Sequence, residues 1–167
     1  MKFVSAFLLA ASLAGAAHAA NPNPDASQVK AAHDLLAAMQ AEKMVRMTAG
    51  MSHYTSPAQR EDVMKKVIAL PPETVYTKLA APVARILSPA TVVEMTHFYQ
   101  SSYGKKVLNN TYNSGAQLYP SDPKPTAAEQ AELKKPAYIK ADQEFKANEQ
   151  AIHHEAFVLL NQVINGK

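Results

Sequence analysis

A chain of 167 residues with 17 basic and 14 acidic side chains has a formal net charge of +3, and its lysines occur as scattered pairs rather than as one basic face. Proteins that bind nucleic acids usually gather basic residues to neutralise several phosphates, so we predict no nucleic-acid partner. The sequence contains no cysteine, which excludes disulfides, catalytic thiols and zinc sites built from thiolates.

The first 20 residues have the features of a secretory signal. Lys2 gives a positive start, residues 3–14 are almost wholly apolar, and residues 17–19 read Ala-His-Ala, which suits a signal peptidase. This apolar run is about a dozen residues long, whereas a membrane-spanning helix needs roughly 20. We therefore predict that residues 1–20 are a signal peptide cleaved after Ala19 or Ala20. Residues 21–167 then form a single domain without a stable membrane span.

The composition of that domain predicts helix throughout. Glycine is scarce, alanine and leucine are plentiful, and no stretch alternates apolar and polar residues for long. Three helix starts carry a capping residue: Ser56 and Ser88 each precede a proline, and Thr126 precedes Glu129 at the spacing of a capping box. We expect an all-α fold, an irregular bundle of about six to seven helices.

The expected helices follow from these starts and from the proline and glycine stops. In chain order they cover residues 27–54 as a pair that bends near Gln40, 57–69, 73–87 with a kink at Pro82, 89–101, 105–119 after a bend at Gly104, and 137–165, with a loop at 120–125.

The C-terminal helical segment, residues 126–165, contains a stripe with a period of seven residues. It consists of Tyr138, Phe145, Ile152 and Leu159. A single helix over residues 137–165 would be about 43 Å long. Its first half is polar apart from the stripe and its second half is broadly apolar, so we expect a buried distal half. Tyr138, Phe145 and Ile152 would form an interaction seam, facing another part of the chain or a second subunit.

Two patterns bear on metal binding, and neither is sufficient to predict a site. Glu94 and His97 stand three apart, as in carboxylate-bridged helical bundles, but the second copy that such sites need is missing. A partly buried His97 beside aromatic residues is the alternative. Met44, Met47 and Met51 line one helix face, which suits copper(I) or adaptable core packing.

Residues 98–106 read Phe-Tyr-Gln-Ser-Ser-Tyr-Gly-Lys-Lys, and this run resembles the DUF2059 family of exported bacterial proteins, which typically show Phe-Tyr-x-Ser-Pro-x-Gly followed by basic or amide residues. Residues 34–43, 75–76 and 88–90 extend the resemblance, which covers roughly residues 30–112. Ser102 departs from the proline that is common in the family. The resemblance implies an α-helical exported protein, without an established activity or cofactor to transfer. With the signal peptide, we expect a periplasmic location.

The same run predicts a helix corner, and a binding site at that corner is the alternative to a purely structural one. Phe98 and Tyr99 are large anchors at the end of one helix, Ser101 is placed to cap the next, and Gly104 permits a close approach or an unusual backbone angle. A purely structural corner and a binding site are both consistent with these residues.

No set of residues has the types and spacing that a known reaction requires, so we expect a non-enzymatic protein without a cofactor. The leading hypothesis is a binding role in the cell envelope, as a homo-oligomer or with an envelope protein partner through the seam of the last helix. The alternatives are a carrier of a small apolar ligand, suggested by the methionine face and the seven tyrosines, and a copper-binding protein.

Overall fold

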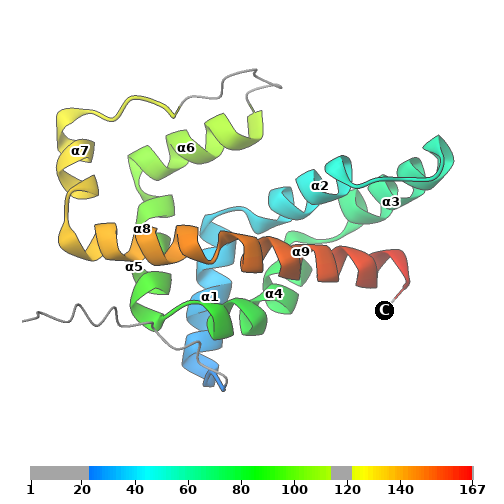
Figure 1. The fold of residues 1–167 in the computed structure, drawn as a ribbon, viewed down its shortest axis with the longest axis horizontal. Helices are drawn as coiled ribbons and strands as arrows, with labels where there is room; N and C mark the ends of the chain where they lie inside the picture. Colours follow the sequence, from blue (N-terminus) through cyan, green and yellow to red (C-terminus); the bar gives the residue numbers. More distant parts are fainter. Residues whose placement is uncertain (1–22, 114–121, 167) are drawn as a thin grey trace, which may run out of the picture.

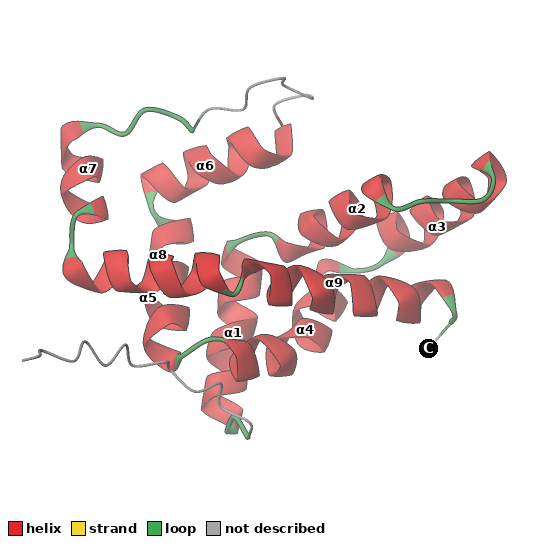
Figure 2. Ribbon diagram, viewed as in Figure 1, coloured by secondary structure: helices red, strands yellow, loops and turns green. Residues whose placement is uncertain are grey.

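The structure, a computed structural model, describes residues 23–113 and 122–166, and the regular elements within these ranges are all α-helices (Figures 1 and 2). The nine helices of the described ranges are α1 (Ala26–Ala38), α2 (Ala41–Met51), α3 (Pro57–Ala69), α4 (Pro72–Ile86), α5 (Pro89–Gln100), α6 (Ser102–Asn113), α7 (Ala127–Leu133), α8 (Pro136–Ala147) and α9 (Glu149–Ile164).

The all-α prediction is confirmed, but six to seven helices is too few. A short separate α7 and a break in the last helix account for the difference. The predicted signal peptide and the predicted end of a helix near residue 119 lie outside the described residues.

Three of the helices begin where the capping residues predict. The Oγ of Ser56 accepts a hydrogen bond from the Gln59 amide at 3.2 Å, and the Oγ of Ser88 accepts one from the Thr91 amide at 3.3 Å. Thr126 forms the reciprocal capping box that begins α7. Each cap satisfies amide groups that a helix start would otherwise leave without an acceptor, which is why local sequence is sufficient to place these starts.

The chain bends at Gln40, as predicted. Gln40 has a φ of 57°, the left-handed region, and it separates α1 from α2. α4 runs on through Pro82, which lies inside it. The bend allows α2 to leave the direction of α1 and to pack on α9.

The predicted single helix over residues 137–165 is wrong, because the helix breaks at Asn148. This residue has φ −105° and ψ 3°, and its side-chain amide donates to the Glu144 carbonyl oxygen at 2.8 Å. The backbone amide of Asn148 donates to the same carbonyl oxygen at 3.1 Å, so the side chain shares an acceptor of the helix ladder. α8 and α9 still run almost end to end across the molecule (Figure 1).

The core lies where α1 packs on α4 and α5, and where α9 covers α2 and α4. Leu35, Leu36, Val45 and Leu160 are among its fully buried side chains. The expectation of a buried distal half is met on one face of α9, where Ile152, Ala156, Leu159 and Leu160 are buried, whereas Phe157 is exposed.

The predicted seam packs against the chain itself. Phe145 is 8% exposed and Ile152 is 2% exposed, both as members of the core, and Tyr138 is half-buried against it. Of the two alternatives, another part of the chain is therefore the one that the structure shows. Phe145 and Ile152 leave little surface for a second subunit.

One carboxylate joins α5 to α8. Glu144 of α8 accepts hydrogen bonds from the Ser88 amide at 2.7 Å, from the Ser88 hydroxyl at 2.8 Å and from the Thr91 hydroxyl at 2.7 Å. It thus adds a tertiary cap to the N-terminus of α5, where a negative charge is favourable. These three hydrogen bonds join α5 to α8, two of the helices that line the site described next.

None of the helices in the described ranges has both the length and the apolar character needed to cross a membrane.

Candidate functional site

The aromatic corner predicted from the sequence is a tight junction between α5 and α6. Ser101 lies between the two helices: its Oγ accepts from the Gly104 amide at 3.0 Å and donates to the Phe98 carbonyl oxygen at 2.6 Å. Ser101 therefore caps α6, as predicted. The bend falls at Ser101 rather than at Gly104, which lies in the first turn of α6.

Gly104 is required by a close approach rather than by an unusual backbone angle. It is buried, and a Cβ added to it would lie 1.9 Å from the carbonyl oxygen of Phe98 and 2.8 Å from the Cα of Tyr99. Only glycine lets the first turn of α6 approach the last turn of α5 so closely.

Phe98 is the centre of a cluster of aromatic rings at this corner. Its ring centroid lies 5.0 Å from that of Tyr99, 6.2 Å from that of Tyr103 and 5.2 Å from that of Tyr138. Tyr99 continues the cluster inward and meets Phe145 at 6.1 Å. Such edge and tilted contacts are favourable for aromatic pairs, and they connect α5, α6 and α8.

Polar contacts fasten α7 across this cluster. Glu129 accepts from the Ser102 hydroxyl at 2.6 Å, from the Lys106 ammonium at 2.9 Å and from the Thr126 amide at 2.8 Å. These bonds, led by that from Ser102, lower the pKa of Glu129 to about 2. α7 has no buried residue, so Glu129 is its principal connection to α6.

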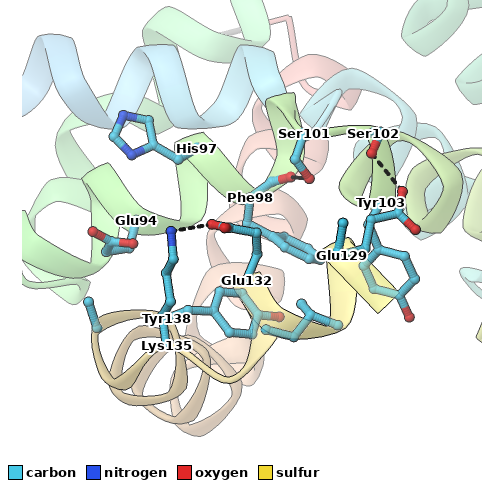
Figure 3. Close-up of a pocket in the computed structure, with 13 residues that line it drawn as sticks. Glu94, His97, Phe98, Ser101, Ser102, Tyr103, Glu129, Glu132, Lys135 and Tyr138 are labelled. Carbon is cyan, nitrogen blue, oxygen red and sulfur yellow. Dashed lines mark hydrogen bonds and ion pairs between the residues drawn. The ribbon is translucent and has the colours of Figure 1, made fainter. Parts of the chain in front are cut away.

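A groove of about 480 Å³ lies between α5, the start of α6, α7 and the start of α8. Its volume falls within the range of small-molecule sites. Its lining consists of Glu94, His97, Phe98, Ser101, Ser102, Tyr103, Ala128, Glu129, Glu132, Leu133, Lys135, Ala137 and Tyr138. The rings of Phe98, Tyr103 and Tyr138 form an apolar wall (Figure 3).

Charged groups lie at the other end of the groove, where Glu94 and His97 project from α5 and Lys135 pairs with Glu132 (Figure 3). Glu94 has no ion-pair partner among the residues that the structure describes. Burial raises the pKa of Tyr138, with a smaller contribution from the negative charge of Asp142. The Tyr138 hydroxyl, neutral at physiological pH even at the ordinary tyrosine pKa near 10, is thus still harder to ionise.

The structure brings two of the four predicted binding residues into this groove. Phe98 and Ser101 line it, whereas Tyr99 and Gly104 lie behind it, at the aromatic core and the helix contact. Tyr138 was predicted for the seam and instead lines the groove.

The sequence did not predict the other side chains that line the groove, among them Tyr103, Glu132 and Lys135. Only the capping box at Thr126 indicated that a helix starts near two of them. No local pattern indicates that this helix docks against α6.

Glu94 and His97 share the groove but do not form a metal cluster. In the described ranges, no group of three or more histidine, aspartate or glutamate side chains lies close enough to hold a metal ion. His97 is exposed, so the expectation of a partly buried histidine is wrong.

The methionine face divides between core and surface. Met44 is 5% exposed, whereas Met51 is 74% exposed. A second cavity, of about 260 Å³, is lined by Met39, Met44, Met47 and aromatic and aliphatic neighbours, and Met51 is not part of it. The three methionines of the predicted copper face thus do not converge on one cavity, and copper binding stays a prediction.

No known protein family, no curated protein and no solved structure matches this chain.

Proposed function

We propose that this chain is an exported, non-enzymatic binding domain of the bacterial periplasm, and that the groove between α5, α6, α7 and α8 holds its ligand. One observation carries the proposal: side chains from four helices converge on a groove of about 480 Å³ that has an aromatic wall at one end and charged groups at the other. A concave site that combines apolar surface with a few polar groups is typical of small-molecule recognition.

The packing of the last two helices favours a small ligand over self-association. The seam residues Phe145 and Ile152 are in the core of the chain itself, so a dimer through them would have to open the fold. The alternative of a ligand carrier therefore has stronger support than the homo-oligomer. An envelope protein partner that acts through another surface stays a prediction.

The side chains of the groove support binding rather than catalysis. The side chain of His97 is exposed and has no hydrogen-bond partner among the described residues, and the carboxylate of Glu94 likewise has none. A general base or an activated nucleophile is usually oriented by a neighbouring side chain. Export, the periplasmic location and membership of the DUF2059 family are part of the proposal on the strength of the sequence alone.

A groove-filling variant with a matched control tests the proposal. Ala128 lines the groove and Ala131 does not, although both are exposed alanines of α7. The probe is N-phenyl-1-naphthylamine, a neutral aromatic dye whose fluorescence rises in apolar sites. We expect saturable binding to the protein with residues 1–20 removed, a loss of at least about tenfold in affinity for Ala128→Phe, and little change for Ala131→Phe.

Circular dichroism of both variants establishes that the fold is kept. Absence of saturable dye binding to the parent protein, or equal binding by Ala128→Phe and the parent, would contradict the groove as the ligand site.

A further inference from the structure

The geometry points to a small organic cation, a substituted ammonium group carried by a soluble molecule, as the ligand of the groove between α5, α6, α7 and α8. This inference rests on the proposed function and names its ligand class. Three features of the groove carry it: the aromatic wall, the uncompensated carboxylate of Glu94, and the position of Lys135.

The aromatic wall suits an alkylated cation. Phe98, Tyr103 and Tyr138 line the groove together, with Leu133 beside them. The face of an aromatic ring carries partial negative charge and attracts a cation, while the methyl groups of a substituted ammonium bury apolar surface against the ring. The hydroxyls of these tyrosines are neutral at physiological pH, because the ordinary tyrosine pKa near 10 lies above it, and burial raises the pKa of Tyr103 and of Tyr138 further.

The charges of the lining add to this preference. Lys106 balances Glu129 at 2.9 Å, and Lys135 balances Glu132. Glu94 then remains without a cationic partner in the described part of the chain. With His97 counted as neutral and Lys106 included, the groove has an excess of one negative charge. An anionic ligand would be repelled by three carboxylates, whereas a cation would be attracted by the Glu94 carboxylate, which has no cationic partner among the described residues.

Lys135 shows that the groove accommodates a cation. Its alkyl chain runs along the groove and its ammonium points to Glu132, on the side where Glu94 also projects (Figure 3). The side chain of Lys135 is 60% exposed, so it can move away at little cost. A bound organic cation would occupy this position and would leave Glu132 as a second carboxylate for it.

The test compares two molecules of equal shape and different charge. Choline and 3,3-dimethylbutan-1-ol differ by the replacement of a positively charged nitrogen with carbon. Binding is measured from amide chemical shifts of the groove residues during titration of the protein with residues 1–20 removed. We expect choline to bind about tenfold more tightly than the neutral alcohol. Equal affinities would overturn the cation, while dye binding to the groove would still support a ligand site.

Single-charge variants locate the effect. Glu94→Gln and Glu132→Gln should each weaken choline binding by up to about fivefold, and Lys135→Gln should strengthen it by a similar factor, because it removes the competing ammonium. Glu61→Gln, which lies on α3 outside the groove, is the control and should change nothing. Weaker binding by Lys135→Gln, or an equal loss in Glu61→Gln, would contradict the inference.

A second arm separates a soluble ligand from a lipid headgroup. The protein is sedimented with phosphatidylcholine vesicles at the concentrations used for choline. Sedimentation with vesicles in the absence of any shift by free choline would overturn the assignment of a soluble ligand.

Discussion

The close contact at the α5–α6 corner predicts that replacing glycine with alanine has opposite effects on stability at two positions. Gly104→Ala places a methyl group 1.9 Å from the Phe98 carbonyl oxygen, and the other atoms within 3 Å of it also belong to the backbone. Gly50→Ala, near the end of α2, meets no atom within 4 Å. Both glycines lie in helices, so the change in helix propensity is the same in kind and only the surroundings differ.

The magnitude follows from the distances. Real Cβ atoms essentially never approach another atom closer than 3.0 Å, so the Phe98 carbonyl must recede by about 1.1 Å. Backbone cannot yield by a rotamer change, which puts the cost of overpacking near 3 kcal/mol. The higher helix propensity of alanine relative to glycine offsets up to about 1 kcal/mol of this cost. We expect Gly104→Ala to lower the free energy of unfolding by about 2 kcal/mol, and Gly50→Ala to raise it by up to about 1 kcal/mol.

Urea unfolding followed by circular dichroism at 222 nm measures both changes in free energy on the protein without residues 1–20. In thermal unfolding of a domain of this size, we expect the melting temperature to fall by about 4–8 °C in Gly104→Ala and to rise by up to about 4 °C in Gly50→Ala. If Gly104→Ala were as stable as the parent protein, the corner would not be as tight as described. A parallel loss in both variants would point to helix ends rather than to the contact with Phe98.

Two further predictions concern carboxylates. Glu144→Ala should lower the free energy of unfolding by about 2–4 kcal/mol, because Ser88 and Thr91 lose three charge-assisted hydrogen bonds. The control is Gln143→Ala, at an exposed neighbouring position. An equal loss of stability in the control would contradict the role of Glu144 as a cap. Glu129 has a folded pKa of about 2, below its ordinary value near 4.5. Its stabilisation is therefore complete above about pH 5 and is lost as the pH falls toward 2. Urea midpoints should fall less between pH 7 and 3 in Glu129→Gln, and an unchanged pH dependence would contradict its role.

Local chemistry explains which helix boundaries the sequence could predict. Ser56, Ser88 and Thr126 satisfy amide groups within three residues of themselves, so the information that starts a helix is contained in one short stretch. These features depend on no distant contact.

The break at Asn148 shows the limit of a periodic pattern. The stripe of Tyr138, Phe145 and Ile152 keeps its period of seven across the break, because only one residue is irregular and the backbone bonds into and out of Asn148 are kept. The asparagine side chain that bonds to the Glu144 carbonyl is the local signal, and its weight is small beside the heptad.

The groove could not be predicted, since it depends on residues far apart in sequence. Phe98 and Ser101 were predicted from local chemistry, as an aromatic anchor at a helix end and a capping residue. Tyr138 stands 40 residues away from Phe98, and the bond between Ser102 and Glu129 spans 27 residues. A tertiary contact of this kind leaves no periodic signal in a single sequence.

The helices that line the groove are held in place by interactions of different strength. Substitutions that weaken one helix or another should therefore affect stability and ligand affinity to different degrees. α5 and α8 are fixed by the core and by Glu144, so damage to their junction lowers the stability of the whole domain. α7 buries no residue and depends on Glu129, which a change of pH or one substitution can disturb. A ligand that touches α7 gains affinity only when this helix is docked, so its binding free energy includes the cost of docking α7. Loss of Glu129 should therefore appear in ligand affinity more strongly than in the unfolding of the core, while loss of Glu144 should appear in both.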